Sequence, residues 1–295
     1  MSGLDFCLAL CRFVHFAALM PLAGDALLQS ALAPAGGAAS RRPRLQAWLA
    51  IATAVTALLW LMLLAAAFTG DLHAMTSPQT LSLVLDQTAF GRVWRLRLIL
   101  AAAMLAAAFL AMAGFSWSRR YVMPVLAMTL LVSLGLTGHA ADGGLATELA
   151  QALHLAAGGL WLGGLIVLLR LALTGDDGAR GDTGLATALT RFSRLGPWLV
   201  AAIALSGFVN AAALLRGPGD LLVSGYGRTL SLKLVLVVGM LACAANNRFR
   251  LAPKLVTAPA PTRHALIRSL VIEMALGLGV LAVTALLGML GPPGD

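Results

Sequence analysis

Long apolar blocks separated by short polar segments dominate this sequence. About 20 consecutive apolar residues are enough for one helix to cross the hydrocarbon core of a bilayer, and eight blocks reach that length. The pattern predicts an all-α fold, a polytopic bundle of transmembrane helices with eight spans. Since no connection is long enough for a soluble domain, residues 1–295 are expected to form a single membrane domain. The predicted spans cover approximately residues 5–32, 45–69, 93–114, 121–141, 147–172, 189–215, 227–247 and 266–290.

Composition narrows the class of protein further. Charged residues make up 11% and hydrophobic residues 60% of the 295 positions, whereas charged residues are about a quarter of an ordinary soluble domain. So little charge excludes a soluble domain, a disordered chain and, despite a net charge of +9, a nucleic-acid-binding protein. The first block carries Asp5 and Arg12 and has no basic start, so we interpret it as a retained transmembrane helix and not as a cleaved signal peptide.

The distribution of basic residues predicts the orientation. The first, third, fifth and seventh connections carry 14 of the 21 Lys and Arg residues, and the opposite side carries five. Because cytoplasmic loops are enriched in Lys and Arg, these four connections are predicted to be cytoplasmic and both termini periplasmic, although the cluster at 92–97 opposes this assignment. On the periplasmic side, Ser77-Pro78 is a favourable helix start, which predicts a short surface helix over residues 79–90.

Polar residues inside the apolar blocks are costly and therefore informative. In the first block Cys7, Cys11 and His15 recur at i, i+4 and i+8, on one helical stripe about 80° wide, and Asp25 returns to the same face. Thiolate and imidazole suit soft or borderline metals such as copper. The stripe thus indicates metal ligands; a packing role for the two cysteines and a hydrogen-bonded packing role for His15 remain open.

Two further histidines lie in later blocks. His139 ends the fourth block, where an interfacial role is the alternative to metal binding, and His154 lies about two turns inside the fifth. With a rise of ~1.5 Å per residue, His15 and His154 are both roughly 10–15 Å below the periplasmic surface. The segment after His154 has the small-xxx-small spacing that permits close helix approach. The residues expected to pack there are Gly158, Gly159, Trp161, Gly163 and Gly164.

Several ionisable or amide side chains remain inside the predicted bundle. An isolated charge there would cost several kcal/mol, so these groups either line a transport path or pair with one another. Histidines near the periplasm with carboxylates beneath them suit a protein that handles cations. The residues concerned are Arg12, Asp25, Asn210, Lys233 and Glu273.

The order and spacing of several segments resemble the bacterial copper resistance protein D (CopD/PcoD) family of inner-membrane proteins. The segments are GHAAD at 138–142, ALHLAAGGLWLGGL at 152–165, RFSRLGPWLVAAIALSGFVNA at 191–211, GYGRTLSLKLVLV at 225–237 and RSLVIEMALGLGVLAVTALLGML at 268–290. The resemblance implies copper homeostasis, passage of copper across the membrane and a small periplasmic copper-binding partner, copper resistance protein C. Cys7 and Cys11 are not part of the family pattern. The family positions present here are Arg12, His15, His139, His154, Asn210, Lys233 and Glu273.

We therefore expect a multi-pass protein of the bacterial inner membrane, not an enzyme, that moves copper as Cu(I) or Cu(II) from a periplasm-facing histidine site. No G-x-x-x-x-G-K-[ST] motif for ATP binding occurs. The alternative is a b-type membrane cytochrome or copper-dependent redox protein, because two histidines at matched depth can ligate one haem. A third possibility is a scaffold that docks the periplasmic copper carrier. Membrane lipid is an expected partner and nucleic acid is not; the oligomeric state stays undetermined.

Overall fold

The computed structural model describes residues 2–32, 43–137, 144–174 and 179–291. These residues form helices and no strands, and eight helical segments are long and apolar enough to cross a membrane. The eight-span all-α bundle predicted from the sequence is thus confirmed. The last residues of the predicted fourth span, 138–141, lie outside the described residues.

The spans are built from one helix each or from helical segments that run on from one another. Three shorter helices lie between spans: η2 (Leu72–Met75), α3 (Pro78–Gln87) and α8 (Asp220–Val223). The spanning elements are α1 (Gly3–Leu32), α2 (Pro43–Thr69), α4 (Ala89–Met112), η3–α5–η4 (Ser118–Val122, Met123–Val132 and Ser133–Leu136), α6 (Leu145–Thr174), α7 (Ala179–Leu214), α9–η6–α10 (Gly225–Asn246, Asn247–Leu251 and Ala252–Thr257) and α11 (Pro259–Leu287).

Two spans contain a π-helical turn that the sequence pattern did not predict. The turn η3 ends two residues before Pro124, and η6 ends two residues before Pro253. Proline has no backbone N–H and its ring crowds the preceding turn, so a wider turn lets the helix continue past it. For this reason the seventh span extends helically to Thr257, ten residues beyond its predicted end at residue 247.

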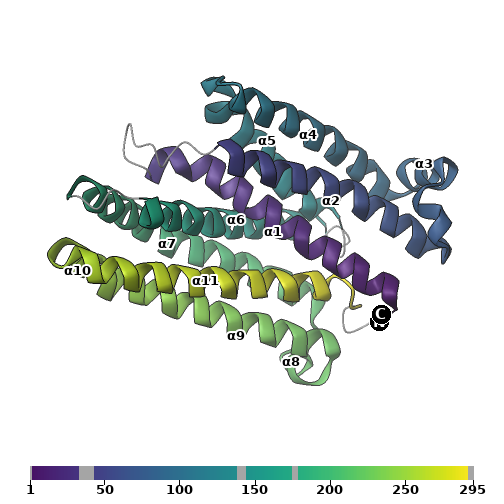
Figure 1. Cartoon of the computed structure of the whole chain (residues 1–295). Coiled ribbons are helices and arrows are strands. Elements are labelled where there is room, and N and C mark those ends of the chain that lie inside the picture. Colours follow the sequence, from purple (N-terminus) through teal and green to yellow (C-terminus); the bar gives the residue numbers. More distant parts are fainter. Residues whose placement is uncertain (1, 33–42, 138–143, 175–178, 292–295) are drawn as a thin grey trace.

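Helix α1 is central in the bundle (Figure 1). It packs against α2, α5, α6 and α11, while α4 packs on α2, α7 on α6 and α9 on α11. The spans containing α7 and α9 are therefore peripheral and bury far less of their surface than α1 or α6. Most of the closely packed core lies where α1, α2, α4, α5 and α6 meet.

Close backbone packing joins α1 to α6. A Cβ atom placed on Gly24 would lie 2.7 Å from the carbonyl carbon of Gly159 and 3.0 Å from the Cα atom of Gly163. Lipid tails are as apolar as leucine, so helices in a membrane associate mainly through such close contacts and through hydrogen bonds. The backbones of α1 and α6 can approach to this distance only because all three positions lack a side chain.

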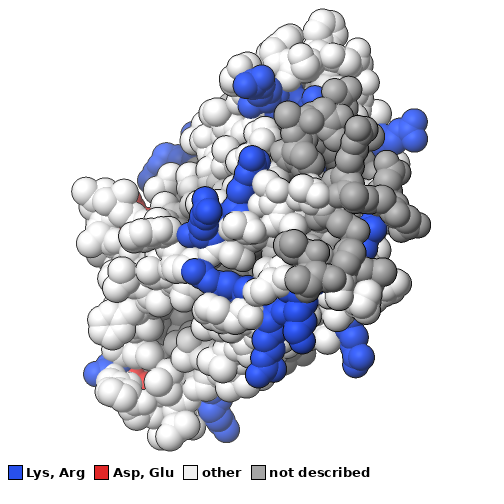
Figure 2. Space-filling model, turned by 90° about the vertical axis from the view of Figure 1, so that its left-hand side faces the viewer, with Lys and Arg blue, Asp and Glu red and all other residues white. Residues whose placement is uncertain are grey.

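One end of the bundle is rich in basic side chains. The start of α1 and the end of α11 lie at the same end, together with α3 and α8, whereas α10 lies at the opposite end (Figure 1). Figure 2 looks onto the α10 end, where Lys and Arg side chains gather and few acidic atoms are visible. This distribution agrees with the predicted cytoplasmic location of that end.

The short helix after residue 77 is confirmed as α3. The Ser77 hydroxyl oxygen accepts a hydrogen bond from the Thr80 amide at 3.3 Å, and Pro78 occupies the first turn. One face of α3 packs on the first turn of α4. This close contact requires glycine at position 91 of α4, because a Cβ atom there would collide with the backbone of Val84 and Leu85 in α3. The opposite face is exposed at Leu83.

Candidate functional site

His15 is the centre of a buried cluster in the predicted periplasmic half. It is fully buried, its Nδ1 atom lies 2.9 Å from the Thr56 hydroxyl, and its Nε2 atom lies 2.8 Å from the Arg97 guanidinium. A guanidinium group can only donate, so Nε2 accepts and the ring proton is on Nδ1, which donates to Thr56. Both ring nitrogens of His15 are therefore engaged in hydrogen bonds.

Two arginines hold positive charge in this cluster. The fully buried Arg97 donates to the Leu130 carbonyl at 2.6 Å and to the Ser133 hydroxyl at 2.7 Å. Arg12 donates to the Gly288 carbonyl, which joins α1 to the end of α11. The ion pairs present in the described part of the chain involve neither arginine. Carbonyl oxygens and aromatic rings, not carboxylates, therefore compensate these cations.

Aromatic side chains fill the space around His15. Its ring centroid lies 5.6 Å from that of Trp60 and 6.4 Å from those of Phe16 and Trp94. The guanidinium carbon of Arg12 lies 4.9 Å from the centroid of Trp60, and that of Arg97 lies 5.0 Å from the centroid of Trp94. Such cation–π contacts stabilise a desolvated charge. Because these rings occupy the space beside the imidazole, the geometry offers no observation in favour of the haem alternative.

The two cysteines on the stripe of His15 have different surroundings. Cys11 is buried and its thiol donates to the Thr56 carbonyl at 3.4 Å, whereas Cys7 is exposed. Across the described residues, no group of three or more His, Cys, Asp or Glu side chains is arranged to hold a metal ion. Metal binding by Cys7 and Cys11 stays a prediction from spacing.

His154 lies in a separate cluster, between α6 and α7. Its Nδ1 atom is 3.2 Å from the Ile203 carbonyl and 3.2 Å from the Ser206 hydroxyl. A carbonyl can only accept, so Nδ1 carries the proton. Nε2 then keeps its lone pair, and no hydrogen bond to it is present among the described residues. Gly207 makes room for the ring, since a Cβ atom there would lie 3.3 Å from its Cε1 atom.

Two further polar groups act near His154. Asn210 donates to the Gln151 side chain at 2.7 Å, which links α7 to α6 one turn closer to the predicted periplasm. Lys233 of α9 is close enough to His154 to interact with it electrostatically. The face of α7 carrying Ser206, Gly207 and Asn210 is thus turned toward α6.

Asp25 belongs to a third cluster, in the predicted cytoplasmic half. It is fully buried, it is ion-paired with Arg170 of α6, and it accepts a hydrogen bond from Gln46 of α2 at 2.9 Å. The Arg170 guanidinium keeps two buried nitrogen atoms without a partner. The ion pair lies just beyond the Gly24–Gly163 contact and joins α1 to α6.

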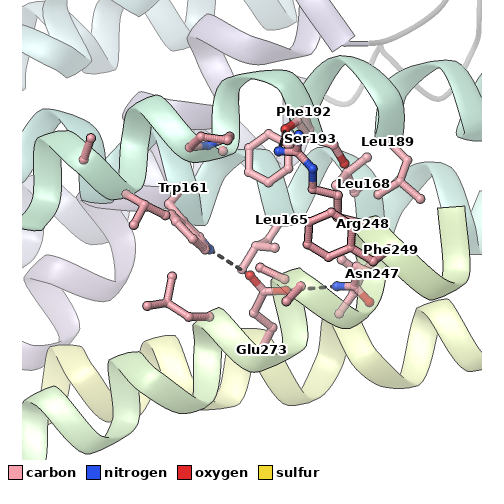
Figure 3. Close-up of a pocket in the computed structure, with 18 residues that line it drawn as sticks. Trp161, Leu165, Leu168, Leu189, Phe192, Ser193, Asn247, Arg248, Phe249 and Glu273 are labelled. Carbon is pink, nitrogen blue, oxygen red and sulfur yellow. Dashed lines mark hydrogen bonds between the residues drawn. The ribbon is translucent and has the colours of Figure 1, made fainter.

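Glu273 has neutral partners. Its carboxylate is almost fully buried and accepts one hydrogen bond from the Trp161 indole at 2.8 Å and one from the Asn247 amide at 3.1 Å. Figure 3 shows both bonds, with Trp161 on α6 and Asn247 on the π-helical turn after α9. Lys233 is not among the hydrogen-bonding or ion-pairing partners of this carboxylate. The carboxylate faces a cavity of about 400 Å³.

The remaining predicted site residues are placed as follows. His139 lies outside the described residues. Gly158 faces Met20 of α1, and Gly164 packs against the Phe192 ring of α7. Arg97 and Arg170 were not among the predicted site residues, yet both are buried inside spans. Their position within apolar sequence could have indicated that they are buried.

These observations define a class: a helical membrane protein with eight spans that buries histidines, arginines and carboxylates in separate polar clusters. Sequence comparison then identifies the family. Residues 3–149 match the family described as copper resistance protein D-like, N-terminal domain, and residues 186–287 match copper resistance protein D. The chain belongs to the copper resistance protein D family, and it is a multi-pass protein of the bacterial inner membrane with a role in copper homeostasis.

Individual relatives agree with this assignment. The chain is 31% identical to the inner membrane protein YebZ of Escherichia coli (strain K12), over 95% of this chain and 97% of that protein. It is 32% identical to copper resistance protein D of Pseudomonas syringae pv. tomato, over 95% of each. Copper transport protein CutJ of Bacillus subtilis (strain 168) is 31% identical over 56% of this chain and 29% of its own length. No solved structure matches the chain.

Proposed function

We propose that this protein moves copper across the inner membrane and that His154 receives the ion from the periplasmic side. The main support is the hydrogen bonding of His154, whose Nδ1–H is directed at the Ile203 carbonyl while Nε2 keeps a free lone pair. Metal-binding histidines commonly donate their second ring nitrogen to a carbonyl or carboxylate, which fixes the tautomer and the ring orientation. Imidazole is a suitable ligand for Cu(I) and Cu(II).

The surroundings of His154 suit brief occupation by copper. Lys233 is close enough to repel a cation bound at Nε2. A transported ion has to bind strongly enough to enter a site and weakly enough to leave it. In this proposal Lys233 weakens the copper complex and so favours release.

His15 has a conditional place in the proposed path. Its Nε2 lone pair accepts a hydrogen bond from Arg97 at 2.8 Å, and the positive guanidinium disfavours a copper ion there. Copper therefore binds His15 only after Arg97 withdraws. Asp25 is ion-paired with Arg170, which supports charge pairing as its role in this state.

A periplasmic copper-binding protein of the copper resistance protein C type is the proposed donor of copper. The end of the bundle that carries α3 and α8 would face it. Leu72, Leu222 and Val223 are apolar side chains exposed at that end, with exposed fractions of 66%, 78% and 80%. Leu222 and Val223 are neighbours in α8, and exposed apolar side chains that lie together can serve as a protein or membrane contact surface.

Copper accumulation in cells tests the proposal. His154→Ala should abolish the copper accumulation that depends on this protein, and His15→Ala should reduce it. His73→Ala is the matched control, because His73 is exposed in η2, outside the spans, and its loss should leave accumulation unchanged. Expression must be equal in all strains. If His154→Ala cells accumulate as much copper as the wild type, His154 is not the entry ligand.

A further inference from the structure

The cavity beside Glu273 lies between two peripheral helices. Its walls come from α7 and from α9 with η6, and its floor comes from α6 and α11 (Figure 3). Helix α7 packs on α6 and α9 packs on α11, whereas η6 and α10 contact α7 at one end, so the two walls are separated only over the part of the cavity formed by α7 and α9. The wall residues Pro197, Ala201 and Ala245 are exposed. In a membrane the mouth between these walls opens sideways to lipid.

The end of the cavity nearer the basic surface is bridged. Arg248 of η6 donates to the Ser193 carbonyl of α7 at 2.6 Å, which links the two walls. This bridge narrows the cavity at that end, so the wider opening between the walls, which faces lipid, is the route by which a ligand enters in this proposal. Such a ligand has to be soluble in the membrane and apolar over most of its surface.

Aromatic and aliphatic side chains form most of the lining. The rings of Trp161, Phe192 and Phe249 line the cavity together with leucine, valine and alanine side chains (Figure 3). Aromatic side chains favour offset or edge-on contacts with another aromatic ring. A volume of about 400 Å³ falls in the usual range of small-molecule sites. The lining thus suits a flat aromatic body.

Two acceptor groups at the cavity have room for further hydrogen-bond donors. A carboxylate offers about four acceptor positions, and two donors are bonded to Glu273. Asn247 is only 5% exposed, and its buried Oδ1 atom has no hydrogen-bond partner. A buried acceptor without a donor is costly. Hydroxyl groups on a ligand would supply the missing donors, whereas an acyl chain would not.

We propose that this cavity binds a lipid-soluble hydroquinone, with its ring among Trp161, Phe192 and Phe249 and its hydroxyl groups donating to Glu273 and to Asn247 Oδ1. The site is separate from the His154 cluster, and the proposal concerns binding alone. It does not depend on copper transport.

A pair of ligands that differ only in their donors tests this proposal. The purified full-length protein in lipid nanodiscs is titrated, without oxygen, with decylhydroquinone or with its dimethyl ether, and bound ligand is counted by native mass spectrometry. The hydroquinone should bind at least tenfold more tightly, because the ether has the same ring and tail but no hydroxyl donor.

Variants locate the binding. Glu273→Gln should lower hydroquinone affinity about tenfold or more and leave the weak affinity for the ether unchanged. Glu148→Gln makes the same chemical change in the first turn of α6, away from the cavity, and should have no effect. Ala201→Phe should weaken both ligands, because a larger side chain at the exposed mouth obstructs entry.

Two results would overturn the proposal. Equal binding of hydroquinone and ether would show that the cavity is an apolar site for lipid chains. A preference for hydroquinone that survives in both Glu273→Gln and Ala201→Phe would place the ligand elsewhere. Thermal melting of each variant shows that it is folded, and Ala201→Phe tests the location independently if Glu273→Gln does not fold.

Discussion

Replacement of Gly24 by alanine would test the close contact between α1 and α6. The new Cβ atom would lie 2.7 Å from the carbonyl carbon of Gly159, and an ordinary contact begins at 3.4 Å. The helices would therefore have to separate by at least 0.7 Å, the difference of these two distances, to remove that overlap. Both sides of the contact are backbone, so no side chain can rotate away.

The cost follows from overpacking. Adding a methyl group to a well-packed interior typically costs about 1–3 kcal/mol, and a gap of 0.5–1 Å elsewhere along the interface loses roughly a quarter to a half of each dispersion contact. The separation also strains the ion pair between Asp25 and Arg170, which adjoins Gly24. We expect Gly24→Ala to lower stability by about 2–3 kcal/mol, or Tm by roughly 5–10 °C.

The assay is thermal unfolding of the purified protein in detergent, followed by tryptophan fluorescence. Gly279→Ala is the control, because a Cβ atom at position 279 of α11 would meet only the tip of Leu236, at 3.4 Å. Both variants gain about 1 kcal/mol of helix propensity, so their difference reports the contact alone. Equal Tm values for the two variants would refute the close α1–α6 approach.

Three further predictions concern the polar clusters. Asp25→Asn or Arg170→Leu alone should destabilise the protein by about 3–5 kcal/mol, because each leaves a buried partner unpaired, and the double variant should recover a large part of this loss; additive losses in denaturant titrations would contradict the pairing. Thr56→Val should cost about 1 kcal/mol, because the His15 Nδ1–H loses its hydroxyl acceptor and keeps only the Thr53 carbonyl. Thr53→Val, which removes only a bond to its own helix, should cost less, and calorimetry that finds equal losses would disprove the assigned tautomer. Ser206→Ala should retain at least half of wild-type copper accumulation, because the Ile203 carbonyl still orients His154; a loss as complete as that of His154→Ala would contradict this.

Sequence reasoning reached the fold because span length is a local property. An apolar block of 20 residues has to form a helix in lipid, where each backbone polar group needs a partner within its own segment. The same local logic predicted α3 from Ser77 and Pro78. It did not predict that the seventh span continues to Thr257, because the π-helical turn that carries the helix past Pro253 has no clear sequence signal.

The candidate site was less accessible to the same reasoning. Spacing placed Cys7, Cys11 and His15 on one stripe, but spacing does not show what faces that stripe. In the structure Cys7 is exposed, and His15 is bonded to Thr56 and Arg97, residues 41 and 82 positions away in the chain. Matched depth suggested that His15 and His154 act together, yet one faces α2 and α4 and the other faces α7.

The sequence by itself determined that this protein is an eight-span membrane bundle of the copper resistance protein D family, since hydropathy, capping and motif order are all local to each segment. Only the tertiary structure decided which polar groups meet: Arg97 with His15, Arg170 with Asp25, Trp161 and Asn247 with Glu273, and the Ile203 carbonyl with His154. The physical reason is that a buried charge or imidazole takes its function from its partners. In a helical bundle those partners lie on other helices, at sequence separations that no helical period encodes.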